Sequence, residues 1–214
     1  MSTRSITVAL CFGFLVGCGG DDANGPALHH DAGTAHDDDA GSGDAIQRFV
    51  GAVDDDDARV AVVSDRAQLR LFFCGSQGSV ATSTSWFNLD VHDGAIAVAA
   101  PFKVSATIAA DGVIGSVTRA DGIARHFHAA PIAQGTLAGL YEGTSDCGRL
   151  GLIVTQAAPD AELSAQGACV GDGHAPEQVN PILPLTSQAG RIPVQTPGDA
   201  ASATLLRAAS LQPL

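Results

Sequence analysis

Two histidines stand two positions apart in the segment IARHFHA. If this segment is a β-strand, the side chains of His126 and His128 point to one side of it, because successive side chains alternate between the faces. Ile123, Phe127 and Ala129 share the other side, which we expect to face the core. Imidazole is a ligand of zinc, nickel and copper, so the two histidines supply half of a metal site. Spacing identifies no third ligand, and we therefore expect two exposed strand histidines and no bound metal.

Three further histidines lie near the amino terminus. His29, His30 and His36 stand among aspartates, whose carboxylates can also ligate metals. A segment of this composition has no preformed geometry, so any metal site there would be weak. We expect a solvated spacer, and metal scavenging is the alternative.

Four side chains in loop-like sequence are candidate nucleophiles: Ser76, Ser79, Ser145 and Cys147. None lies in a Gly-Xaa-Ser-Xaa-Gly elbow with a strand before it and a helix after it. The histidines at 92, 126 and 128 are candidate bases, but spacing does not place them within hydrogen-bond reach of a nucleophile. The sequence also contains no phosphate-binding loop and no dinucleotide-binding fingerprint. We therefore expect no enzyme activity and no cofactor.

Three cysteines could form disulfides if the chain is exported to an oxidising compartment. Cys147 begins the stretch CGRLGLIVTQ, and Cys169 lies near the end of the stretch ELSAQGACV. If these stretches pair as an antiparallel hairpin, the two cysteines come together, so Cys147–Cys169 is the preferred disulfide. Cys74 is then free and buried in the strand LRLFFC. Three cysteines allow three pairings, so the other two stay open.

The amino terminus has the pattern of a processing signal. Arg4 supplies a positive charge, and an apolar stretch of 12 residues follows from Ile6 to Gly17. A membrane-spanning helix needs about 20 apolar residues. The stretch is too short to span, but it has the length of the apolar region of a secretory signal. It ends in LVGC, where Gly17 directly precedes Cys18.

The sequence LVGC at 15–18 resembles the lipobox of bacterial lipoprotein precursors. The resemblance implies that a diacylglyceryl group is attached to the sulfur of Cys18 and that a peptidase cleaves just before this residue. Membrane anchoring follows, because each buried CH₂ contributes about 0.8 kcal/mol. In Gram-negative relatives an Asp after the cysteine favours the inner membrane, so Gly19 implies the outer membrane where one exists. An ordinary secretory signal with an incidental cysteine is the alternative.

Residues 19–45 contain seven Asp and no Lys or Arg, and they show no apolar periodicity. Such a segment cannot bury enough apolar surface to offset its ordering entropy, so we expect a disordered acidic tether. We therefore divide the chain into a signal peptide (1–17), a lipidated linker (18–45) and a folded body that begins at residue 46.

The sequence of the body has the pattern of an all-β domain from residue 46 to 174. Short apolar stretches rich in Val, Ile, Phe and Thr alternate with turn signals, among them Asp-Gly pairs at 93–94, 111–112 and 121–122. We expect an antiparallel meander of about eight to ten short strands that forms a barrel or a sandwich. The segments flanking Asp54–Asp57 predict a hairpin, with a short amphipathic helix over 46–53 as the rival.

Residues 175–214 are expected to form a Pro-rich extension rather than central strands, because Pro lacks an amide donor. Near its end we expect a short helix, with Asp199 as its N-cap and Leu205, Leu206 and Ala209 on its apolar side.

The composition narrows the possible functions. The formal net charge is −12, which disfavours nucleic acid as a partner. The stretch DGIARHFHAAPIAQGTLAGLYEG at 121–143 resembles a small β domain of bacterial envelope proteins, a resemblance that implies a β fold and no known activity. We expect a lipid-anchored envelope protein whose β domain is a structural or binding module. The alternatives are a metal-handling lipoprotein and an anchored enzyme.

Overall fold

The computed structural model of the protein describes residues 46–186, 190–197, 202–208 and 211. These residues form antiparallel strands and one short helix, α1 (Val80–Ser83), which confirms the all-β prediction. The predicted signal, Cys18 and the acidic linker with its histidines lie outside the described residues.

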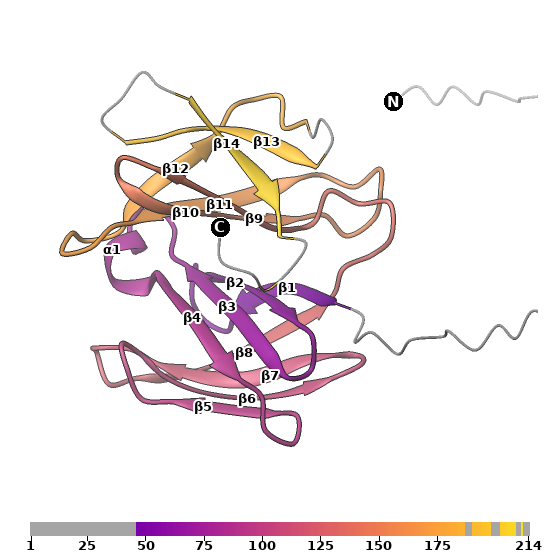
Figure 1. Ribbon diagram of the computed structural model, residues 1–214, viewed down its shortest axis with the longest axis vertical. Helices are drawn as coiled ribbons and strands as arrows, with labels where there is room; N and C mark the ends of the chain where they lie inside the picture. Colours follow the sequence, from indigo (N-terminus) through magenta and orange to yellow (C-terminus); the bar gives the residue numbers. More distant parts are fainter. Residues whose placement is uncertain (1–45, 187–189, 198–201, 209–210, 212–214) are drawn as a thin grey trace, which may run out of the picture. The chain divides into compact units, whose positions relative to one another are not determined.

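Eight strands form the first sheet, in the order β4-β3-β2-β1-β8-β7-β6-β5 (Figure 1). They are β1 (Gln47–Val53), β2 (Arg59–Ser64), β3 (Gln68–Cys74), β4 (Ser85–Asp90), β5 (Ala95–Val98), β6 (Lys103–Ala109), β7 (Gly112–Thr118) and β8 (Ala124–Pro131). The order describes two meanders of four strands, joined where β1 pairs with β8. The predicted hairpin around Asp54–Asp57 is confirmed, because β1 and β2 pair across this turn.

Six further strands close into an up-and-down barrel, in which each strand pairs with the next and the last pairs with the first. They are β9 (Gly139–Ser145), β10 (Gly148–Thr155), β11 (Ser164–Val170), β12 (Glu177–Pro181), β13 (Arg191–Gln195) and β14 (Ser202–Arg207). Residues 46–174 contain eleven strands, close to the eight to ten expected there, and the described part of 175–214 adds three more; the described strands form both an open sheet and a closed barrel.

The carboxy-terminal prediction is wrong in its main point. Residues 175–214 are not an extension of the β body, since they supply β12, β13 and β14 of the barrel. The expected helix is the strand β14: Leu205 is fully buried and Leu206 is 41% exposed, as alternation in a strand requires. Pairing with both β13 and β9 gives this segment more hydrogen bonds than a short isolated helix would have. Asp199 and Ala209 lie outside the described residues.

Burial patterns explain why the strands differ in sequence. Along β6, Val104 and Ala106 are buried whereas Lys103 and Ser105 are exposed. This alternation is typical of a sheet with one face exposed to solvent. Residues 60–63 of β2 are all buried, because this strand is covered on both faces.

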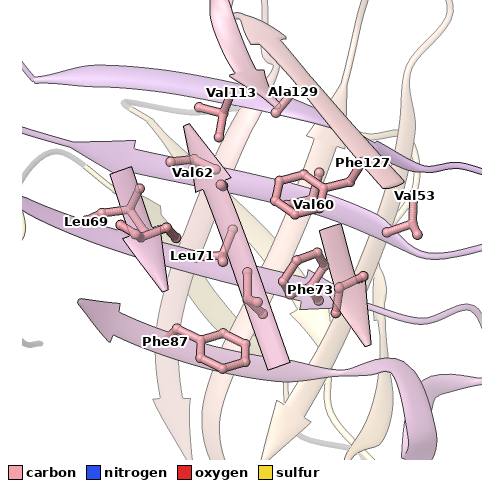
Figure 2. Packing of buried hydrophobic residues seen from close by; sticks show 14 of the residues in the cluster. Val53, Val60, Val62, Leu69, Leu71, Phe73, Phe87, Val113, Phe127 and Ala129 are labelled. Carbon is pink, nitrogen blue, oxygen red and sulfur yellow. The ribbon is translucent and has the colours of Figure 1, made fainter. Parts of the chain in front are cut away.

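One core lies on the inner face of the eight-stranded sheet. It unites residues from strands at opposite edges of the sheet, including Phe87 of β4 and Ile96 of β5, so the sheet curls around a shared interior. Figure 2 shows the centre of this core, where Phe73 meets Phe87 and Phe127 edge-on at ring-centre distances of 6.1 and 5.3 Å. A second core fills the barrel.

A third apolar cluster joins the sheet to the barrel. Ala61, Val63 and Phe72 of the sheet pack against Leu140 and Ile153 of the barrel. The approach is close at Gly151, where a Cβ atom would lie 2.5 Å from the ring of Trp86 and 2.6 Å from that of Phe72. Only glycine at this position lets the barrel strand reach the aromatic pair without a shift.

A buried ion pair crosses the same junction. Arg70 of β3 donates from Nη1 to Oε1 of Glu142 on β9 at 2.8 Å, and the two side chains are 4% and 2% exposed. Arg149 donates to the other oxygen of Glu142, also at 2.8 Å, and its guanidinium lies 3.7 Å from the centre of the Trp86 ring. Both oxygens of the carboxylate are therefore satisfied inside the molecule.

Candidate functional site

The two histidines of the segment IARHFHA lie on one face of a strand, as expected. His126 and His128 are exposed on β8, while Phe127 and Ala129 are buried. Ile123 departs from the prediction, since it precedes the strand and is 56% exposed rather than facing the core. Among the described residues no group of three or more His, Cys, Asp or Glu is arranged to hold a metal ion.

The predicted disulfide is confirmed. Cys147 and Cys169 are bonded, with their Cα atoms 6.1 Å apart, at the end of the β10–β11 hairpin that the sequence suggested. Cys74 is the free, buried thiol, also as expected. Burial raises its pKa to about 12, so this thiol is neutral and protected at physiological pH.

The candidate nucleophiles have other partners. Ser76 and Ser79 both donate to the carboxylate of Asp57, and these two hydrogen bonds, that of Ser76 first, lower the pKa of Asp57. The Oγ of Ser145 lies 2.9 Å from the sulfur of Cys147. Cys147 is not a free thiol, because its sulfur is bonded to Cys169. In the described part of the chain no histidine forms a hydrogen bond with these hydroxyls, so no nucleophile–base pair is assembled there.

A cavity of about 530 Å³ opens where the first sheet meets the end of the barrel. Its lining comes from the start of β1, from the turn between β6 and β7, from the end of β8 with the segment after it, and from the end of β14: Ile46, Gln47, Arg48, Phe49, Ala110, Pro131, Ile132, Ala133, Gln134, Gly135 and Arg207. The volume is within the range of small-molecule sites, which often lie between structural units. Among the described residues that line it none is acidic, although the chain as a whole carries a charge of −12.

Two arginines lie at this cavity, one from each structural unit. Arg48 of β1 donates from Nε to the carbonyl oxygen of Ala208, at 2.9 Å, so it reaches across to the end of β14. Burial lowers the pKa of the Arg48 guanidinium, and the neighbouring positive charge of Arg207 lowers it further. The two cations are thus near enough to repel each other, an arrangement that a bound anion would relieve.

Arg207 is held by the barrel backbone. Its Nη2 donates to the carbonyl oxygen of Ala138, and its Nε–H is buried and donates no hydrogen bond. Gly139, with φ +155°, makes room for this side chain, since a Cβ there would lie 3.0 Å from Nε. The guanidinium is therefore positioned by packing and by the carbonyl of Ala138.

Four other arginines of the body differ from Arg207 in this respect, whereas Arg59 resembles it, since its guanidinium donates to the hydroxyls of Thr155 and Ser164. The guanidinium groups of Arg70, Arg119, Arg125 and Arg149 all form ion pairs with carboxylates. Among the described residues, no carboxylate lies within ion-pair distance of Arg207. The sequence offered no signal for this site, because Arg48 and its partner Ala208 are 160 positions apart.

Comparison with protein-family models finds no match, and comparison with curated proteins finds none either. In the part of the chain that the structure describes, no helix is long and apolar enough to cross a membrane. The function therefore has to be argued from the sequence and from the geometry of the site.

Proposed function

We propose that this protein is a lipid-anchored binding module of the bacterial cell envelope. The observation that carries the proposal is the sequence LVGC at 15–18, which follows at once on a charged start and a short apolar stretch. In this proposal the sulfur of Cys18 carries the lipid, and residues 19–45 form an acidic spacer before the folded body. The outer membrane is the expected location if the cell has one, since Gly19 and not Asp follows the cysteine.

Binding rather than catalysis is favoured by the side chains that line the cavity. Arginine and glutamine supply hydrogen-bond donors there, while the remaining lining is apolar or small. A site of this kind can hold and orient a ligand, but its lining contains no Ser, Cys, His, Asp or Glu to act as nucleophile or general base. We therefore assign the body a binding role and no reaction.

Mass spectrometry of the intact protein extracted from bacterial membranes tests the anchor. We expect a chain that begins at Cys18 and carries the added mass of acyl groups. The Cys18→Ser variant should lack this mass and leave the membrane fraction. Cys11→Ser is the matched control, because Cys11 lies within the apolar stretch and its loss should leave lipidation unchanged. A wild-type protein without lipid mass would refute the proposal, as would a Cys18→Ser protein that stays equally membrane-bound.

A further inference from the structure

We infer that the cavity between β1 and β14 binds a small carboxylate whose hydrocarbon part lies against the apolar lining, with Arg207 as the main partner of the carboxylate. This inference names a ligand class for the proposed binding module and rests on that function, but it does not depend on the lipid anchor.

The positive charge of Arg207 favours an anionic ligand. Arg207 borders the cavity and has no carboxylate partner among the described residues, and Arg48, a second positive charge, also lines the cavity. Partly buried cations are stable when an anion compensates them, and an unpaired one carries a desolvation penalty. An anion in the cavity would compensate the charge of Arg207.

The number of available donors selects a carboxylate. A guanidinium has five N–H groups. In Arg207 one Nη2–H is used by the carbonyl of Ala138, and the Nε–H is shielded. Three N–H groups remain at the end of the fork, which suits the two oxygens of a carboxylate in a bidentate pair. A phosphate dianion would need more donors than this.

The rest of the lining selects a ligand with a hydrocarbon part. Ile46 and Ile132 are partly exposed and present apolar surface, whereas Phe49 lies behind them in the core, and Ala110, Ala133 and Pro131 leave room beside them. Burying hydrocarbon there is favourable by about 25 cal/mol per Å². Phosphate or formate would leave this surface uncovered, whereas a short fatty acid would use both the charged and the apolar parts.

Calorimetric titration of the full chain carrying Cys18→Ser tests the inference, since this form needs no detergent and binding is measured apart from anchoring. The probes are octanoate, octanol and inorganic phosphate. We expect octanoate to bind more tightly than about 1 mM. Octanol and phosphate should each bind at least about tenfold more weakly, a difference of about 1.4 kcal/mol. The preference for octanoate over octanol should fall as salt is added, because screening weakens the charge interaction.

Variants then assign the binding to Arg207. Arg207→Gln should weaken octanoate binding about tenfold or more, and Arg207→Lys should recover part of the loss because it keeps the charge. Arg191→Gln is the matched control: Arg191 is exposed on β13, outside the cavity lining, and its loss should change nothing. A thermal melt of each variant establishes that it is folded, and octanoate should raise the melting temperature of the wild type.

Three results would overturn the inference. The first is the absence of octanoate binding at about 1 mM in the folded wild-type body. The second is equal affinity for octanoate and octanol, which would mean that the carboxylate is not recognised. The third is an Arg207→Gln variant that is folded and binds octanoate as the wild type does.

Discussion

The ion pair between Arg70 and Glu142 gives the sharpest test of how the sheet is joined to the barrel. Replacing Glu142 by Leu removes both acceptor oxygens and leaves Arg70, which is 3% exposed, without its carboxylate. Breaking a buried pair in this way costs about 3–5 kcal/mol, because the guanidinium stays desolvated after it has lost the carboxylate of Glu142. Arg149 adds little to this cost, since its side chain is 28% exposed and keeps its contact with Trp86. We therefore expect the free energy of unfolding to fall by about 3–5 kcal/mol.

Urea unfolding with linear extrapolation measures this loss. In the double variant Arg70→Met with Glu142→Leu, no buried charge is left unpaired, so most of the stability should return, to within about 1 kcal/mol of the wild type. Asp121→Asn is the control, because its carboxylate pairs with Arg125 at the surface and should leave stability unchanged. The reasoning fails if Glu142→Leu costs less than about 1 kcal/mol, or if the double variant is no more stable than the single one.

Three further predictions concern single positions. Replacing Cys147 and Cys169 together by Ala should lower the free energy of unfolding by about 3 kcal/mol in urea, since the disulfide closes a loop with a sequence separation of 22. Cys74, whose pKa is raised to about 12, should resist thiol reagents at pH 8 until the protein unfolds; the unfolded thiol ionises first, so stability should fall between about pH 9 and 12 as pH rises. Gly151→Ala should cost about 1–3 kcal/mol by overpacking against the aromatic pair, and a melt that matches the wild type would contradict this.

Strands with local signals were predictable from the sequence. Asp93 and Gly94 both adopt positive φ, at 52° and 73°, and turn the chain from β4 to β5 as an Asp-Gly pair should. The pair at 111–112 also lies at a hairpin, yet neither residue has positive φ, so its position was right and its expected conformation was not. The disulfide was predictable for the same reason, because it depends on a hairpin between neighbours in the chain.

The carboxy-terminal strands were not predicted because they depend on contacts between segments that are far apart in the sequence. Pro193 argues against a strand, but its carbonyl oxygen accepts from Ile182, just past the end of β12. The reciprocal bond, from residue 193 to the carbonyl of Ile182, is missing because Pro has no N–H; the cost is one hydrogen bond at the end of the ladder with β12. Over so few residues, the spacing of Leu205 and Leu206 fits a helix as well as a strand. Pairing with β13 and β9, which closes the barrel, makes this segment a strand. The cavity lined by Arg48 and Arg207 also depends on barrel closure, because Arg207 belongs to β14.

The order in which the strands pair has a consequence for the growing chain. β1 lacks its second neighbour until residues 124–131 are made, and β9 lacks its second neighbour until residues 202–207 are made. Exposed edges of this kind recruit strands from other chains. Nascent molecules should therefore be prone to aggregation until residues 202–207 have been made, and a stop codon before residue 202 should yield inclusion bodies instead of a shortened soluble product.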